Sequence, residues 1–487
     1  MLRALEEEEH DEHEEHEGEE EEHGHEEEAF GTVENSDSET DGASIGASYV
    51  ADRGFIGFSI TTFGSNYGVP GHAHEHEEEE PPAGEEEEEE IVRIDLEQVR
   101  FDVRGDLELD GLISEVKFRA ARNDYEHTEF EGAEVGTLYE TDGTDARLEL
   151  HHRPTDTLEG AIGVQFKSID FTAIGDEAFV PPSDTRRTSL FAFEELKLSD
   201  TLVLQGSFRA ERQTIDTPAF TMDYSDTALG ASVGAVWTLT DMLDLSANLS
   251  VTERRRRRPN SVPSAPSHGD VAAGCDAASV ALGDGILDKE TSTNLDVTLR
   301  GGDGPFEWTV TGWMNSADDY ILAQPTGAEE DGFQVFEYRQ RDVDLYGAEV
   351  EARIEMFDGP VGHLHGRLFS DFVHAEESAS GAYVARMPPL RVGGGLHFTR
   401  DALEASISAT WHADQDNTAP NELRTDGYAL LSAEELSWFM QDQGDIPVPA
   451  GQRTCRRTQD ARRRASPLKD TVPLRGRALH AGLRWIF

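Results

Sequence analysis

The stretch Ala478-Leu479-His480-Ala481-Gly482-Leu483-Arg484-Trp485-Ile486-Phe487 decides the fold class that we predict for this chain. Successive side chains of a β-strand point to opposite faces, so every second residue of the stretch shares a face. The residues on one face are Leu479, Ala481, Leu483, Trp485 and Phe487. The residues between them on the other face include His480, Gly482 and Arg484. A long strand with one apolar face that ends on an aromatic residue predicts the closing strand of a transmembrane β-barrel.

The same two-faced pattern recurs along the chain. Two further stretches have apolar residues at alternate positions: Leu243, Leu245, Ala247, Leu249, Val251 and Leu403, Ala405, Ile407, Ala409, Trp411. Strands of a soluble β-sandwich, the alternative fold, also alternate, but they usually have about 5–6 residues. The alternating stretches here run to about ten residues or more, as a tilted membrane strand requires. The pattern therefore favours an antiparallel transmembrane barrel.

The connections between these segments are alternately short and long from residue 43 onward. The short turns are predicted at 51–54, 106–114, 153–157, 198–201, 240–242, 301–304, 357–360 and 400–401. The stretches between them are longer, polar and contain Gly or Pro. Short turns on one rim and long loops on the other are the layout of a transmembrane barrel.

Composition restricts the function classes. Hydrophobic residues make up 37% of the 487 residues, and no apolar run reaches the roughly 18–20 residues that a transmembrane helix needs. The formal net charge is −58, and residues 1–90 contain 32 Asp and Glu against Arg3 and Arg53. Such a charge repels phosphate, so nucleic acid is excluded as a partner. Cys275 and Cys455 are too far apart in sequence for a disulfide to be argued.

The chain start lacks the features of an exported protein. Met1-Leu2-Arg3-Ala4-Leu5 runs directly into Glu6–Glu9, with no apolar signal-peptide region. About nineteen strands can be counted, an odd number, whereas single-chain bacterial barrels have even counts. We therefore expect this sequence to be internal to a longer protein that supplies about three more strands.

Several stretches resemble TonB-dependent outer-membrane receptors, in particular the zinc-uptake branch. They are residues 65–72, 123–132, 171–179, 287–292, 319–321, 346–349, 388–391 and 466–470. The resemblance implies the bacterial outer membrane as location, a 22-stranded barrel with a plug in its lumen, and the TonB energising complex as a partner. The plug and the TonB contact region have no counterpart here. The fold expected is thus an all-β, N-terminally truncated barrel in contact with outer-membrane lipid.

The resemblance also defines the organisation that we expect. Residues 1–42 would form an acidic His/Glu-rich extracellular loop, and residues 43–487 the barrel, with a second acidic extracellular loop at 64–90. Residues 254–282 and 439–460 break the family pattern, because they contain Arg and Pro and lack alternation. A frame-shifted reading of a GC-rich gene accounts for both segments; a real extracellular insertion is the alternative for the first.

Two tracts of interleaved His and Glu are the candidate metal ligands. They contain 8 of the 18 histidines: His10, His13, His16, His23, His25, His72, His74 and His76. Imidazole together with carboxylate suits zinc and neighbouring metals, whereas carboxylate alone suits calcium or magnesium. A solvated acidic loop with no ligand is the alternative. The sequence predicts capture of a zinc ion, which is a transported ion and not a resident cofactor.

Other candidates are weaker. Glu126 and His127 stand near the outer end of a predicted strand and could form a more defined metal site or an ordinary surface pair. His363 and His365 share a strand face. No motif of an enzyme is present, so we expect a receptor for energised zinc uptake. The alternatives are a receptor for a metal chelate such as a siderophore, and a passive metal buffer or non-functional fragment.

Overall fold

The computed structural model of the chain describes residues 35–74, 90–175, 178, 182–217, 224–254, 288–330, 333–401, 403–419, 422–437, 440–443 and 446–449. All regular structure in these residues is β-strand. No helix among them is long and apolar enough to cross a membrane. The predicted closing strand, 478–487, lies outside the described residues.

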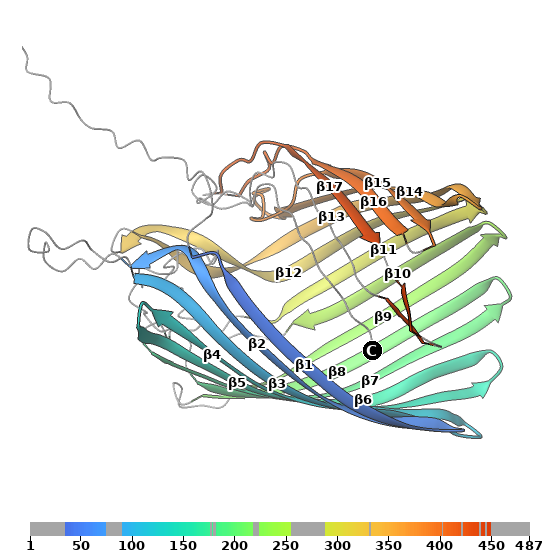
Figure 1. Cartoon of the computed structure of the whole chain (residues 1–487), viewed down its shortest axis with the longest axis horizontal. Coiled ribbons are helices and arrows are strands. Elements are labelled where there is room, and N and C mark those ends of the chain that lie inside the picture. The colour runs from blue at the N-terminus through green and yellow to red at the C-terminus, as the bar shows by residue number, and fades with distance from the viewer. Residues whose placement is uncertain are drawn as a thin grey trace, which may run out of the picture.

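Seventeen strands form one curved antiparallel sheet, in which each strand pairs with the next one along the chain. Figure 1 shows this sheet wrapped around a central space. The strands are β1 (Ser38–Ala51), β2 (Gly54–His74), β3 (Glu90–Glu108), β4 (Ile113–Glu131), β5 (Glu134–Thr155), β6 (Leu158–Gly175), β7 (Ser183–Ser199), β8 (Leu202–Asp216), β9 (Tyr224–Thr240), β10 (Leu243–Arg254), β11 (Glu290–Asp303), β12 (Phe306–Glu330), β13 (Phe333–Gly359), β14 (Gly362–Glu377), β15 (Arg391–Arg400), β16 (Leu403–His412) and β17 (Tyr428–Ser437).

Alternation of the side chains builds the wall of this barrel. Leu249 and Val251 of β10, and Ile407 and Trp411 of β16, are all exposed on the same face of the sheet as their apolar neighbours. The polar residues between them point to the other face. An apolar exterior and a polar interior are the arrangement that lipid outside and water inside select. The predicted all-β, antiparallel barrel is confirmed.

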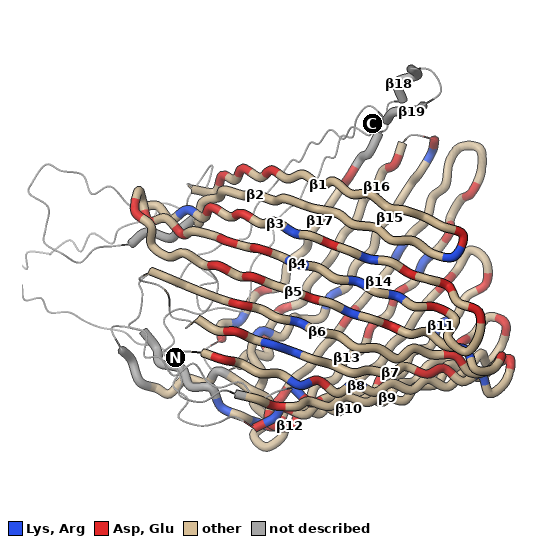
Figure 2. The backbone as a smooth tube through the Cα atoms, turned by 90° about the horizontal axis from the view of Figure 1, so that it is seen from below, with Lys and Arg blue, Asp and Glu red and all other residues tan. Residues whose placement is uncertain are grey.

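The two rims differ as predicted. Tight turns join β1 to β2, β3 to β4 and each later pair in this series, at the positions predicted from the sequence. Hydrogen bonds link these turns to neighbouring strands, for example from the Thr238 N–H of β9 to the Thr201 carbonyl in the turn between β7 and β8, 2.8 Å. Figure 2 shows acidic residues at these turns and charges of both signs along the strands. We call this end the short-turn rim and the opposite end the loop rim.

Two strands are longer than the sequence predicted. β1 begins at Ser38, so the predicted boundary at residue 43 falls inside a strand, and β2 continues through residue 64, the predicted loop start, to His74. The pairing of Ser38 with Tyr67 shows that both strands extend at the loop rim. The alternation of apolar and polar residues stops before the strands do. Backbone hydrogen bonds between strands need no apolar face outside the lipid, so the pairing of β1 with β2 continues there.

Neither edge of the sheet has an outer partner among the described strands. β1 pairs with β2 and β17 pairs with β16, and no described strand joins β1 to β17. Figure 1 shows β1 and β17 at the two borders of the sheet. A separate two-stranded ribbon, β18 (Met440–Gln443) and β19 (Ile446–Pro449), occupies part of the irregular segment predicted at 439–460. The predicted closure near Leu483 lies outside the described residues.

Candidate functional site

The lumen face carries a connected polar network. In β5–β8 the Arg209 guanidinium donates hydrogen bonds to Ser189 at 2.8 Å and to Glu211 at 2.6 Å. It also reaches Gln165, which donates to Asp145 at 3.0 Å. Residues that alternate with these, such as Leu190 and Phe208, are exposed on the outer face. The network therefore lines the interior, where charged groups can be satisfied by one another and by water.

The structure separates the predicted pair Glu126 and His127. The two residues are consecutive in β4, and consecutive side chains of a strand point to opposite faces. Phe118, also at an even position of β4, is exposed on the outer face. Glu126 therefore faces outward and His127 faces the lumen. The two side chains therefore do not share a face of the strand, and a metal-binding role for either residue stays a prediction.

His127 belongs to an aromatic group on the lumen face near the loop rim. Its ring stacks on Tyr139 with centroids 4.4 Å apart, and Tyr125 approaches its edge at 5.5 Å. Tyr139 in turn lies 6.4 Å from Phe171. The Nδ1 atom of His127 is buried without a hydrogen-bond partner. This group, which we call the β4–β6 aromatic group, offers flat apolar surfaces to the lumen.

A second group with similar chemistry lies on the strands β14–β17. Arg367 and Arg391 approach the Phe369 ring at 5.3 and 5.5 Å. His412 stacks on Tyr428 at 4.3 Å, and Arg391 pairs with His412 in the strand register. Cations over aromatic faces are favourable contacts, and the edges of both guanidinium groups are bound to carboxylates, Arg367 to Glu351 at 2.9 Å and Arg391 to Asp371 at 2.8 Å. This β14–β17 group is also on the lumen side.

Residues 35–37, which follow the first His/Glu tract in sequence, are bound to the two strands that flank the second tract. Asn35 donates hydrogen bonds to the Val69 carbonyl at 3.1 Å and to the Val92 carbonyl at 2.7 Å. Arg93 donates to Asp37 at 2.9 Å and to Asn35 at 3.2 Å. Its hydrogen bond and charge hold the pKa of Asp37 below the usual value. We call this contact between residues 35–37 and strands β2 and β3 the rim junction.

Most of the candidate metal ligands in the two tracts lie outside the residues that the structure describes. His10, His13, His16, His23, His25 and His76 lie outside the described residues. His72 and His74 are at the end of β2, where the backbone is described and the side chains are not. Within the described residues, no three His, Cys, Asp or Glu side chains are grouped so that they could hold a metal ion.

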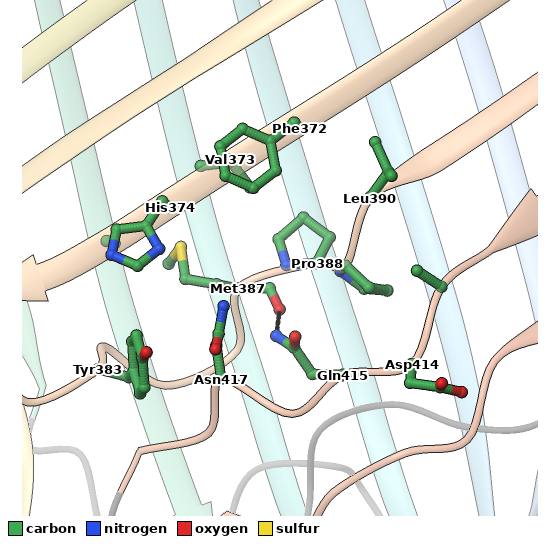
Figure 3. Close-up of a pocket in the computed structure, with 13 residues that line it drawn as sticks. Phe372, Val373, His374, Tyr383, Met387, Pro388, Leu390, Asp414, Gln415 and Asn417 are labelled. Atoms are coloured by element: carbon green, nitrogen blue, oxygen red, sulfur yellow. Dashed lines mark hydrogen bonds between the residues drawn. The ribbon is translucent and has the colours of Figure 1, made fainter.

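A cavity of about 150 Å³ lies at the loop rim, where β14 meets residues 383–390 and 413–417. Figure 3 shows His374 beside Tyr383 and Met387, with Gln415 bonded to the Met387 carbonyl. His374 and Phe372 are on the outer-face positions of β14, and Tyr346 lies 4.9 Å from His374. Aromatic side chains at this height of a barrel wall are typical of the membrane interface.

Sequence reasoning missed the rim junction and both lumen groups. Their members come from different strands, and they meet because of the strand register. Asn35 and Arg93 carried no local signal that they would meet. The quoted stretches 65–72 and 123–132 did mark two of the strands concerned, β2 and β4.

Comparison with known proteins places the chain in a family. Residues 31–441 match the model of the TonB dependent receptor-like beta-barrel, so the chain belongs to that family. Its members are outer-membrane proteins, and the family is one of transport receptors and not of enzymes. The predicted location and the absence of an enzyme activity agree with this membership.

The chain is also similar to individual receptors. It is 20% identical over 326 residues to the vitamin B12 transporter BtuB of Photobacterium profundum, covering 67% of this chain and 48% of that protein. It shares its fold with the copper transporter OprC, with a TM-score of 0.66, 14% identity, and coverage of 85% and 66%. It also shares its fold with the FrpB iron transporter from Neisseria meningitidis (F5-1 variant), with a TM-score of 0.66 and 12% identity. That match covers 92% of this chain and 72% of the transporter. The chain thus spans about half the length of the curated relative.

Proposed function

We propose that this chain forms the barrel of a receptor that takes up a metal ion across the outer membrane with energy from TonB, and that the ion is zinc. The observation that carries the proposal is the rim junction. It attaches Asn35 and Asp37, which follow the first His/Glu tract in sequence, to strands β2 and β3, which flank the second tract. The described residues that adjoin the two tracts therefore meet at one place on the loop rim.

Two tracts rooted at one place can supply ligands to the same ion. Zinc takes four ligands at about 2.0–2.2 Å from His nitrogen and carboxylate oxygen, so a polar segment must bend to surround it. The proposed ligands are His10, His13, His16, His23, His25, His72, His74 and His76. His127 faces the lumen and is proposed to contact the ion on its way inward. Glu126 faces outward and would act apart from it.

Uptake of radiolabelled zinc by cells expressing the receptor tests this proposal. We expect uptake to stop when an uncoupler removes the proton-motive force, and to fall when the eight tract histidines are replaced by Gln. A matched control replaces His151, which hydrogen-bonds Glu149 at 3.1 Å within the wall, and should leave uptake unchanged. Zinc binding that continues unchanged in the uncoupled cells would instead identify a passive surface buffer.

A metal chelate is the second candidate substrate. The β4–β6 aromatic group and the β14–β17 group favour it, because flat aromatic surfaces suit a large chelate better than a bare cation. The test replaces Tyr139 and Phe369 by Ala. If these variants lose uptake of a ferric chelate while the tract variants keep it, the chelate is the substrate and the zinc proposal is wrong.

A further inference from the structure

Three arginines form a row across neighbouring strands of the barrel wall. Arg104 of β3 is directly opposite Arg119 of β4, and Arg119 is directly opposite Arg147 of β5 in the strand register. Phe118 and Leu148, each next to an arginine of the row, are exposed on the outer face, so the arginines face the lumen. Neighbouring strands are about 4.7–4.9 Å apart, so the row spans about 10 Å of the wall.

Two of the three arginines have no carboxylate partner in the described part of the chain. Arg147 donates a hydrogen bond from Nε to Glu149 at 2.6 Å, and its guanidinium lies 4.0 Å from the centre of the Phe191 ring. Arg104 and Arg119 make neither a hydrogen bond nor an ion pair through their side chains with the residues that the structure describes. Both are exposed to the lumen.

Most carboxylates on the same face beside the row are bound to other cations. Asp102 is paired with Arg100 and Asp145 with Lys167, each at 2.8 Å. Asp106 is two residues along β3 from the row, about 6.6–6.8 Å away. Two guanidinium groups without a partner thus outnumber the remaining carboxylate, and this part of the wall keeps a positive charge in a chain whose formal net charge is −58.

The row costs the wall stability, because like charges directly opposite each other in a sheet are destabilising. The alternation of the strands requires only that lumen positions be polar, and uncharged side chains would satisfy it. A bound anion would offset the repulsion and supply the acceptors that Arg104 and Arg119 lack. The geometry therefore indicates a ligand and not a structural contact.

We propose that Arg104, Arg119 and Arg147 bind a small multivalent oxyanion, with phosphate or carboxylate groups, inside the lumen. The planar guanidinium fork donates two parallel hydrogen bonds to one such group. Directly opposite Cβ atoms in an antiparallel pair are about 4.5–5.5 Å apart, which lets two forks reach one anion. Arg147, fixed by Glu149, extends the row toward β6. Binding of the anion does not depend on the uptake of zinc.

Calorimetric titration with inorganic pyrophosphate tests the site, and tricarballylate, a tricarboxylate, is titrated beside it. The full chain is folded in a non-ionic detergent in metal-free buffer at neutral pH. We expect one bound anion per chain, and the tighter of the two probes identifies the preferred group. Arg104→Gln and Arg119→Gln should each weaken binding by about 10–100-fold, because charged hydrogen bonds are lost. Arg119→Lys keeps the charge without the fork and should weaken binding less.

Equilibrium unfolding gives a readout that a structural role would not produce. Without an anion, Arg119→Gln should be at least as stable as the parent, because the opposed charges are removed. Pyrophosphate should stabilise the parent in proportion to its binding and should leave Arg119→Gln unchanged. An arginine with a structural role would instead lower stability in both conditions when it is replaced, and that result would contradict the proposal.

Arg367→Gln is the matched control. Arg367 is also on the lumen face, next to the outward Leu368, but its guanidinium is bound to Glu351 at 2.9 Å. Pyrophosphate affinity of this variant should stay within about twofold of the parent. If neither anion binds the parent, or if both Gln variants of the row keep the parental affinity, the proposal is wrong. Binding of a Glu-rich peptide in place of both small anions would also overturn it.

Discussion

The assignment of outer and inner faces predicts a large asymmetry between neighbouring residues of β10. Leu249 is 45% exposed and lies beside Val233, 57% exposed, and Leu295, 38% exposed, across the register. The next residue, Ser250, pairs with Ser232 and Asn294 on the lumen side. An arginine at 249 would stand in lipid, whereas an arginine at 250 would stand in the polar interior.

The depth of Leu249 in the membrane sets the free-energy cost of an arginine at this position. Leu249 is six residues from the start of β10 at Leu243, or about 20 Å along a strand with a rise of about 3.3 Å per residue. A tilt of about 45° brings it about 14 Å above the short-turn rim, near the middle of an apolar band about 25 Å high. Arginine at that depth costs about 2–4 kcal/mol, a factor of about 30 to 1,000 in the folding equilibrium.

Equilibrium unfolding in guanidinium from phospholipid vesicles, followed by tryptophan fluorescence, measures this cost. We expect Leu249→Arg to lower the free energy of unfolding by that amount and Ser250→Arg to lower it by less than about 1 kcal/mol. Equal losses in the two variants, or a larger loss for Ser250→Arg, would refute the assignment of the faces.

Two further predictions concern the rims. The pKa of Asp37 is lowered by its hydrogen bond to Arg93. The rim junction should therefore contribute to the free energy of unfolding above the usual carboxyl pKa of about 3.9, and lose this contribution as pH falls through the lower pKa of Asp37 in the folded state. Arg93→Met should abolish this loss of stability in acid when unfolding is measured as a function of pH, and an unchanged loss would contradict the prediction. Gly362 has φ +137°, and an added Cβ would lie 2.6 Å from the Phe398 ring. Gly362→Ala should therefore lower the free energy of unfolding by about 1–3 kcal/mol in the same assay. Gly206→Ala is the control and should leave it unchanged, because there is open space around Gly206.

The sequence predicted the barrel from a property that each strand carries alone. Stretches such as Leu403–His412 alternate because one side meets lipid and the other meets water, and the structure has β16 with those bounds. The short turns were predictable for the same local reason. Strand ends at the loop rim were not, because β1 and β2 continue beyond the lipid, where pairing no longer requires an apolar face.

Contacts between strands depended on the tertiary structure. His365 and His397 meet because two strands are in one particular register, and a shift of one residue would turn every side chain of a strand to the other face. The same rule separates Glu126 from His127, which are neighbours in sequence and lie on opposite faces of the wall. The sequence by itself determined which residues meet lipid, because that choice is made strand by strand. The tertiary structure decided which polar residues meet one another, because a lumen site is assembled across strands by backbone hydrogen bonds that carry no side-chain signal.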